Sequence, residues 1–240
     1  MHIRDDRAYQ LCEELYPLIL GADQFIGEMD LDMKIPDTPL MMQYDIHRFV
    51  TPKEYEKLKH QLQKSFGLNL DQLSKLHPLM IMSFISTSVL QAEHHISLDE
   101  HLWQFAKENG KPTSGLETYE EQFNILHSID PQTLYKQLFE ISRKPSAIKK
   151  STNKSLELYI NGKIHQLYKL SKASMQHLRK KVIYERNRHM VSVINHLHMS
   201  TQYFITVGAG HLSGKFGLIR LLKKSGWQLK PARINSILKE

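Results

Sequence analysis

The sequence has almost no cysteine and no long apolar run. Cys12 is the single cysteine in 240 residues, which excludes an intrachain disulfide and a metal site built from several thiolates. No apolar run approaches the roughly 20 residues that a membrane-spanning helix needs, and the first residues do not match a secretory signal. We therefore expect no transmembrane segment and a reducing, cytoplasmic setting.

Acidic residues are scarce between Arg143 and Arg188. This stretch holds 13 lysines and arginines against only Glu157 and Glu185, in a chain whose formal net charge is +7. Such a block is either a surface for an anionic partner or a set of solvated helix faces. No nucleic-acid-binding motif accompanies it. We therefore favour solvated faces and do not expect a nucleic acid as partner.

Four short stretches are predicted to be strands. Hydrophobic residues make up 41% and charged residues 24% of the sequence, which is ordinary for a folded domain. Three of the stretches contain apolar, β-rich residues, at 23–31, 203–207 and about 227–234, and the fourth, at 111–117, is short and extended. Helical patterns fill the intervals between them. This order predicts an α/β fold with a mixed, mostly parallel central sheet flanked by helices.

The helical patterns suggest how the chain is organised. We expect one domain over residues 1–240, with a helical insertion at about 36–96 and a basic helical segment at about 145–200. Within the insertion, the patterns predict helices at 52–66, 69–76 and 78–90. A helix also begins within a few residues of Met1. That leaves no room for a complete strand before it, so we expect the first strand to be truncated.

Three of the predicted strands end at a titratable residue. Glu28 and Glu117 close two of them, and His211 follows the third across a turn that contains Gly208 and Gly210. Because the carboxyl ends of parallel strands open into one crevice, we expect these side chains to lie together. One imidazole and two carboxylates suit a divalent metal or general acid–base chemistry. Taken alone, such a strand-end residue is more often a helix cap or an ion-pair partner than a catalytic group.

Two further residues bear on this crevice. His2 stands just before the first helix, where it would supply a second imidazole and complete a hydrolytic metal site. Arg186 lies in a dense polar stretch and could bind an anionic group or neutralise a carboxylate. By composition alone, an exposed helical arginine is the simpler interpretation of Arg186.

Several short motifs, taken together, are more specific than any one of them. They follow one another along the chain as Met1-His2, Gly27-Glu-Met-Asp-Leu31, Gly115-Leu-Glu-Thr-Tyr-Glu-Glu-Gln122, Arg186-Asn187 with Met190, and Val207-Gly-Ala-Gly-His-Leu-Ser-Gly-Lys-Phe-Gly-Leu-Ile219. In these motifs and their order, the chain resembles the TraB/PrgY/GumN family, which includes the Tiki proteins of animals. Two Gly-x-x-His motifs define that family. The second is present as Gly208 to His211, and of the first only Met1-His2 remains.

The resemblance implies a fold and an activity. The fold would be an α/β fold like that of the erythromycin-esterase and haem-uptake ChaN proteins, with an inserted helical region. The Tiki branch implies divalent-metal-dependent proteolysis, with Mn²⁺, Co²⁺ or Zn²⁺ as the metal and a peptide or small molecule as substrate. A non-catalytic binding module of the same fold, for haem, a peptide signal or a protein partner, is the alternative.

The resemblance also implies roles for six residues. His2 and His211 would be metal ligands or neighbours of the metal. Glu28 would be a ligand or the general base that activates water, and Glu117 would support the site. Arg186 and Asn187 together would stabilise an oxyanion or a carboxylate.

Overall fold

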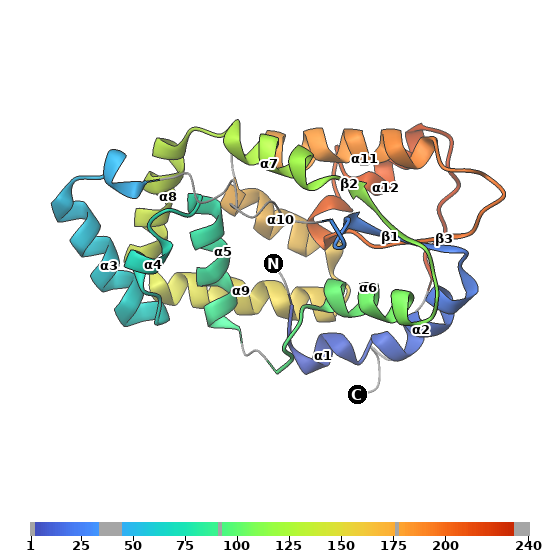
Figure 1. Cartoon of the computed structure of the whole chain (residues 1–240), viewed down its shortest axis with the longest axis horizontal. Coiled ribbons are helices and arrows are strands. Elements are labelled where there is room, and N and C mark those ends of the chain that lie inside the picture. The colour runs from blue at the N-terminus through green and yellow to red at the C-terminus, as the bar shows by residue number, and fades with distance from the viewer. Residues whose placement is uncertain (1–2, 34–44, 91–92, 176–177, 233–240) are drawn as a thin grey trace. The chain divides into compact units, whose positions relative to one another are not determined.

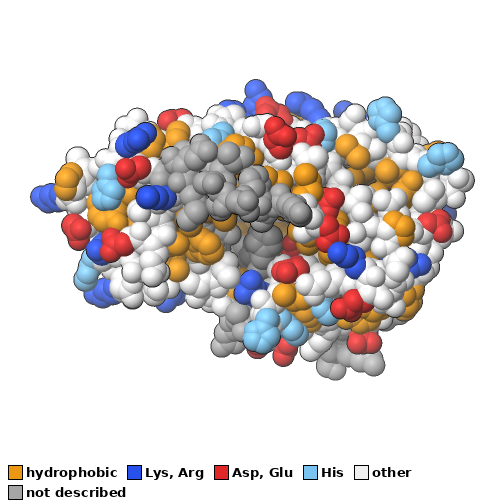
Figure 2. Space-filling model, in the orientation of Figure 1, with side chains coloured by type: hydrophobic (Ala, Val, Ile, Leu, Met, Phe, Trp, Pro, Cys, Tyr) orange, Lys and Arg blue, Asp and Glu red, His pale blue; other side chains and the backbone are white. Residues whose placement is uncertain are grey.

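The computed structural model describes residues 3–33, 45–90, 93–175 and 178–232. These residues form two compact units. The helical unit comprises Lys34–Ala92 and Glu120–Lys154, and the sheet unit comprises His2–Met33, Glu93–Tyr119 and Ser155–Glu240. None of the described helices is long and apolar enough to cross a membrane. On the face shown in Figure 2, lysine and arginine side chains are interspersed with acidic and apolar ones.

The sheet unit contains three parallel strands in the order β2-β1-β3. They are β1 (Gln24–Met29), β2 (Thr113–Glu117) and β3 (Tyr203–Ile205). Figure 1 shows the three strands with helices of the same unit on either side of them. The register pairs Met29 with Glu117 and Ile26 with Ile205. The predicted α/β fold with a helix-flanked sheet is therefore confirmed, and three of its four strands form within the predicted stretches.

The fourth predicted strand, at 227–234, is wrong for the residues that can be assessed. Residues 227–232 form no strand, and 233–234 lie outside the described part of the chain. The Trp227 indole donates a hydrogen bond to Asn195 Oδ1 at 2.8 Å, which holds this segment against a helix end instead of a strand edge. Pro231 also lacks the N–H that a ladder needs. Met1 and His2, where a truncated strand was expected, lie outside the described residues as well.

Helices pack against both faces of the sheet because successive strand residues point in opposite directions. The Phe25 ring meets the edge of the Trp103 indole on α6 (Leu98–Glu108). Ile26 instead joins an apolar cluster with Met190 and Ile194 of α11 (Arg186–Asn195). These two α11 residues are one helical turn apart, so a single face of the helix is buried.

The other helical segments of the sheet unit are shorter or lie at its margins. Asp5 caps α1 by accepting a hydrogen bond from the Arg7 N–H. The segments are α1 (Asp6–Tyr9), α2 (Cys12–Gly21), α10 (Ile164–Met175), the π-helix η4 (Lys180–Glu185), the 3₁₀ turn η5 (Ala209–His211) and α12 (Leu218–Lys224). Helix α9 (Pro145–Ile160) has residues in both units.

The helical unit is built around its own apolar core. Thr51 and Glu54 form a reciprocal capping box at the start of the first long helix, with Pro52 at its first position. Buried residues such as Leu62, Ile81 and Leu138 come from three of its helices. The elements are η2 (Ile46–Arg48), α3 (Pro52–Phe66), α4 (Leu70–Leu73), α5 (Pro78–Val89), α7 (Tyr119–His127) and α8 (Pro131–Arg143). The three helices predicted at 52–66, 69–76 and 78–90 correspond to α3, α4 and α5.

Candidate functional site

Five polar residues that the sequence singled out lie together in the sheet unit, and we call them the strand-end cluster. They are Glu28 near the end of β1, Glu117 at the end of β2, Arg186 and Asn187 at the start of α11, and His211 in η5 after β3. The parallel order of the strands brings these ends to one edge of the sheet. His2, the sixth predicted residue, lies outside the described part of the chain.

Arg186 joins the two carboxylates. Its Nε donates to both oxygens of Glu117 at 3.0 Å. Its Nη2 donates to Glu117 Oε2 and to Glu28 Oε1, each at 2.5 Å. The Nε and Nη2 hydrogens point the same way and form a two-pronged fork that matches a carboxylate. The side chains of Arg186 and Glu117 are only 12% and 1% exposed, so Arg186 is not the exposed helical arginine that composition favoured.

Glu28 is held in its ionised form. Burial alone would raise the pKa of its carboxyl, but that pKa stays below its ordinary value because of the attraction of His211 when its ring is protonated in acid, the charge of Arg186 and the N–H of Gly208. The Gly208 N–H donates to Glu28 Oε2 at 2.8 Å. A Cβ at Gly208 would lie 3.0 Å from the same oxygen, so glycine is what allows the carboxylate to approach the turn.

The bonds of Asn187 determine which nitrogen of His211 carries the proton. The Asn187 amide nitrogen donates to the backbone oxygens of His211 at 3.0 Å and Phe216 at 2.6 Å. The amide oxygen therefore faces His211 Nδ1, at 2.5 Å. Because that oxygen can only accept, Nδ1 must be the protonated nitrogen. Burial lowers the pKa of His211, so the ring is neutral and its Nε2 keeps a lone pair.

The lone pair of His211 Nε2 lies 3.8 Å from Glu28 Oε1. Two acceptors thus face each other without a proton between them, which favours a cation in this space. Two carboxylates and one guanidinium also leave the cluster with one net negative charge. An imidazole whose other nitrogen is fixed by a hydrogen bond is the usual arrangement of a histidine that binds metal. In donor type, orientation and charge, His211 and Glu28 therefore fit a divalent cation.

These two donors are fewer than a metal site needs. Within the described residues, no three His, Cys, Asp or Glu side chains are grouped so that they could hold a metal ion. His2, which the sequence analysis placed at the same crevice, is not among those residues. A complete ligand set therefore needs His2, water or substrate in addition to Glu28 and His211.

The segment after His211 is fixed by contacts with α10. Gly214 has a positive φ of 99°, and a Cβ there would overlap the ring of Tyr168. Next to it, Ser213 Oγ lies 2.6 Å from Nδ1 of His165. These contacts hold the turn that presents His211, and no pattern in the sequence separates His165 from the other histidines of the chain.

Sequence reasoning also missed Arg179, which is 2% exposed. It precedes Arg186 by seven residues, and the π-helix η4 lies between them. In the regular α-helix that the sequence pattern predicts, residues seven positions apart share a face, and π-helical turns such as η4 are frequent at functional sites. The spacing was the only signal in the sequence, and it does not distinguish a buried arginine from a solvated one.

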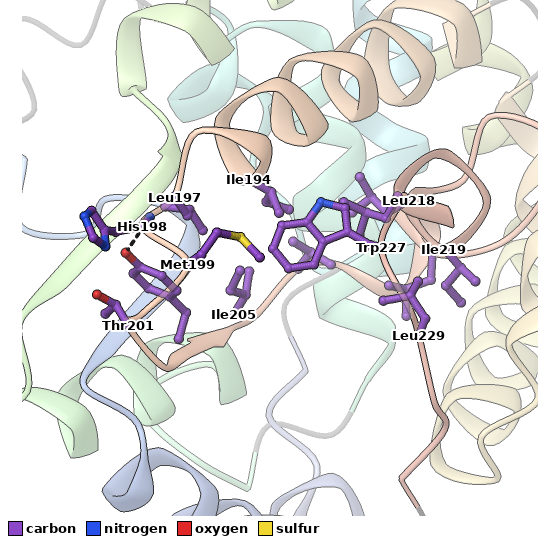
Figure 3. Close-up of a pocket in the computed structure, with 14 residues that line it drawn as sticks. Ile194, Leu197, His198, Met199, Thr201, Ile205, Leu218, Ile219, Trp227 and Leu229 are labelled. Atoms are coloured by element: carbon purple, nitrogen blue, oxygen red, sulfur yellow. Dashed lines mark hydrogen bonds between the residues drawn. The ribbon is translucent and has the colours of Figure 1, made fainter. Parts of the chain in front are cut away.

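A separate apolar pocket of about 430 Å³ lies between α11, β3 and α12. Figure 3 shows the Trp227 indole on one side of it, with Met199 and Ile205 facing the same space. Val207 and Leu212, which flank the turn at 208–211, also line it, whereas no member of the strand-end cluster does. The apolar pocket thus adjoins the turn that presents His211 without including any residue of the strand-end cluster.

Comparisons with known proteins identify a family to which the chain is similar, but no individual protein that matches it. No curated protein and no solved structure shows significant similarity to the chain. The model of the TraB/PrgY/gumN family matches residues 1–231. That match includes every motif on which the resemblance rested and all five residues of the strand-end cluster. The chain therefore belongs to the TraB/PrgY/gumN family.

Proposed function

We propose that this protein is a metal-dependent hydrolase that cleaves peptide bonds. The observation that carries the proposal is the unprotonated Nε2 of His211, which faces the ionised carboxylate of Glu28 at 3.8 Å. These two side chains would hold the ion, with His2 as the expected further ligand. A divalent ion bound there lowers the pKa of a water molecule and polarises a carbonyl group.

The other residues of the cluster keep this pair in place. Glu117 is nearly inaccessible and orients the Arg186 fork, so we assign it a supporting role. Arg186 fixes one oxygen of Glu28 and is the nearest positive charge for a substrate oxyanion or carboxylate. Both N–H groups of Asn187 are used by backbone carbonyls. We therefore assign Asn187 the task of positioning His211 instead of a direct contact with substrate.

Glu28 is also suited to move a proton. Its lowered pKa keeps it ionised at neutral pH, which a general base requires, and a bound metal ion would lower the pKa of the water from which it takes the proton. In this proposal its second oxygen, which accepts from the Gly208 N–H, remains a fixed anchor while the first faces the reacting group.

The proposal is tested by adding metal to metal-stripped protein. Mn²⁺, Co²⁺ and Zn²⁺ are supplied in turn, and cleavage of a mixed peptide library is followed by mass spectrometry. We expect cleavage to depend on metal and to be lost in His211→Ala. The matched control is His196→Ala, because His196 is an exposed histidine on the same unit whose ring bonds only its own helix. Cleavage that is equal in both variants would overturn the proposal.

A non-catalytic binding module of the same fold is the second candidate. It is favoured by the bonds that Glu28 already makes, because Arg186 occupies one oxygen and Gly208 the other. In that case the cluster would be a structural ion-pair network beside a binding surface. Metal binding without any cleavage, across the peptide library and all three metals, would support this candidate over the hydrolase.

A further inference from the structure

Arg179 has an unusual environment for a buried arginine. Its Nη1 donates to Ser171 Oγ at 2.9 Å. Its guanidinium carbon lies 4.3 Å from the ring centroid of Tyr168 and 5.7 Å from that of Tyr184. Within the described residues, its Nε and Nη2 have no hydrogen-bond partner, and no ion pair involves it. The charge of Arg179 is thus held by one hydroxyl and two aromatic rings.

The two nitrogens without a partner form one fork. Nε and Nη2 of an arginine present parallel hydrogens on the same edge, which is the geometry that binds a carboxylate with two bonds. Arg186 uses the same pair of nitrogens for Glu117. The structure therefore contains one filled fork and one open fork, seven residues apart on a continuous helical segment.

An open fork on a buried arginine is energetically unfavourable. A guanidinium cannot release its proton at any physiological pH. It therefore cannot avoid the cost of a buried charge by becoming neutral, as a lysine or a histidine can. Ring faces offset only part of the lost hydration, and each buried donor without an acceptor adds to the cost. An anionic group in the plane of the fork would remove both penalties.

Arg179 also lies beside the strand-end cluster. The segment that follows it, η4, contacts η5, and α10 contacts η5 as well. Ile183 of η4 approaches the position that a Cβ on Gly210 would take, at 3.9 Å, and Tyr168 fills the space next to Gly214. The positive charge of Arg179 contributes to the lowered pKa of His211, after burial and Arg186. An anion in the open fork would therefore lie near His211 and Glu28.

We propose that Arg179 is the anchor of a carboxylate-binding subsite next to the strand-end cluster, and that it holds a carboxylate of the peptide substrate. Tyr168 and Tyr184 fix the plane of the guanidinium, and Ser171 fixes its third nitrogen. The carboxylate is either the free C-terminal group of the peptide or the side chain of an acidic residue. The choice of a peptide as ligand rests on the proposed function, whereas the binding of a carboxylate does not.

The test is a binding measurement on metal-stripped protein, so it does not depend on turnover. Isothermal titration calorimetry compares N-acetyl-Ala-Ala, which has a free carboxylate, with N-acetyl-Ala-Ala-amide, which has none. We expect the acid to bind about tenfold or more tightly than the amide. A third probe, N-acetyl-Glu-amide, carries only a side-chain carboxylate. Whichever acid binds more tightly identifies the source of the carboxylate.

Two variants connect the preference to the open fork. In Arg179→Gln we expect the acid and the amide to bind equally weakly. Arg179→Lys retains the charge without the fork, and we expect it to lose most of the preference while folding normally. Arg188→Gln is the matched control, because Arg188 is an exposed arginine of the next helix that lies over the Phe216 ring. It should retain the full preference.

Three results would overturn the subsite. They are equal binding of acid and amide to the unaltered protein, a preference that survives in Arg179→Gln, and binding of inorganic phosphate in place of either acid. The first result would mean that water fills the fork. If the protein binds the peptide acid more tightly than the amide but cleaves no peptide, the subsite is supported and the hydrolase is rejected. Cleavage whose rate does not depend on the terminal or side-chain carboxylates of the library peptides would support the hydrolase and reject the subsite.

Discussion

The neighbourhoods of Arg186 and Arg179 differ in one respect that decides their roles. Both side chains are buried, both belong to one helical stretch and both lie close to His211. Arg186 has two carboxylates in its fork, whereas Arg179 has aromatic rings against its face and an empty fork. A filled fork stabilises the fold and orients Glu28. An empty fork costs stability, and a ligand would offset that cost.

The largest expected effect on stability comes from replacing Arg186, whose fork holds the two carboxylates. Arg186→Met removes the guanidinium from the buried carboxylate of Glu117, and breaking a buried ion pair in this way costs about 3–5 kcal/mol. We expect a fall of that size in the free energy of unfolding, measured by urea denaturation. The double variant Arg186→Met/Glu117→Leu should recover much of the loss because it also removes the buried negative charge. A change below about 1 kcal/mol in the single variant would mean that the fork is not structural.

The neighbour of Arg186 on the same helix gives a second, smaller effect. Asn187→Leu keeps the volume but removes the acceptor that fixes the proton on His211 Nδ1. Loss of such an orienting partner lowers metal affinity by about 10- to 100-fold. We expect this drop in Mn²⁺ affinity together with an unchanged far-UV circular dichroism spectrum. Unaltered affinity would show that His211 does not need Asn187 to present its Nε2.

Acid sensitivity should distinguish the two neighbourhoods as well. The folded pKa of Glu28 is lowered, so its contribution to stability is fully present above its unfolded pKa, which the ordinary value places near 4.5. It is lost as the pH falls from there through the lower folded pKa. We expect urea midpoints to fall in this window for the wild type and for Arg179→Met, and to fall less for Glu28→Gln. An equal decline in Glu28→Gln would assign the acid sensitivity to other groups.

The smallest effect is expected at the empty fork. Arg179→Met removes a buried charge that lacks a counter-ion and keeps an apolar side chain of similar length against the two tyrosines. Replacing buried charge by apolar volume is often neutral or stabilising. We expect the free energy of unfolding, without ligand, to stay within about 1 kcal/mol of the wild type or to rise. A loss as large as that of Arg186→Met would show that both forks are structural.

The difference between the two arginines also shows how far the sequence can be interpreted. Glu28, Glu117 and His211 were predicted together because each stands at or just after the end of a predicted strand, and parallel strands bring such ends to one edge. The burial of Arg186 was not predictable, because it depends on bonds to residues 69 and 158 positions away. The burial of Arg179 was not predictable for the same reason. Its surroundings are created by α10 and η4 packing on the turn at 208–211.

The wrong strand at 227–234 has a similar cause. The apolar residues around Trp227 fit a strand as well as they fit the lining of a pocket, and Leu229 does line it. One hydrogen bond from the indole to Asn195, on a helix that ends 32 residues earlier, decides between them. The local sequence pattern thus predicted that polar side chains cluster at the strand ends. Long-range contacts determined which of the side chains there are buried.

Metal binding tests the central claim most directly. Metal-stripped wild type, Glu28→Gln, His211→Ala and the control His196→Ala are titrated with Mn²⁺, Co²⁺ and Zn²⁺ by isothermal titration calorimetry. We expect one of these ions to bind the wild type and His196→Ala with equal affinity, and to bind Glu28→Gln and His211→Ala about 100-fold or more weakly. Equal binding by all four proteins, or no binding by the wild type, would contradict a metal site between Glu28 and His211.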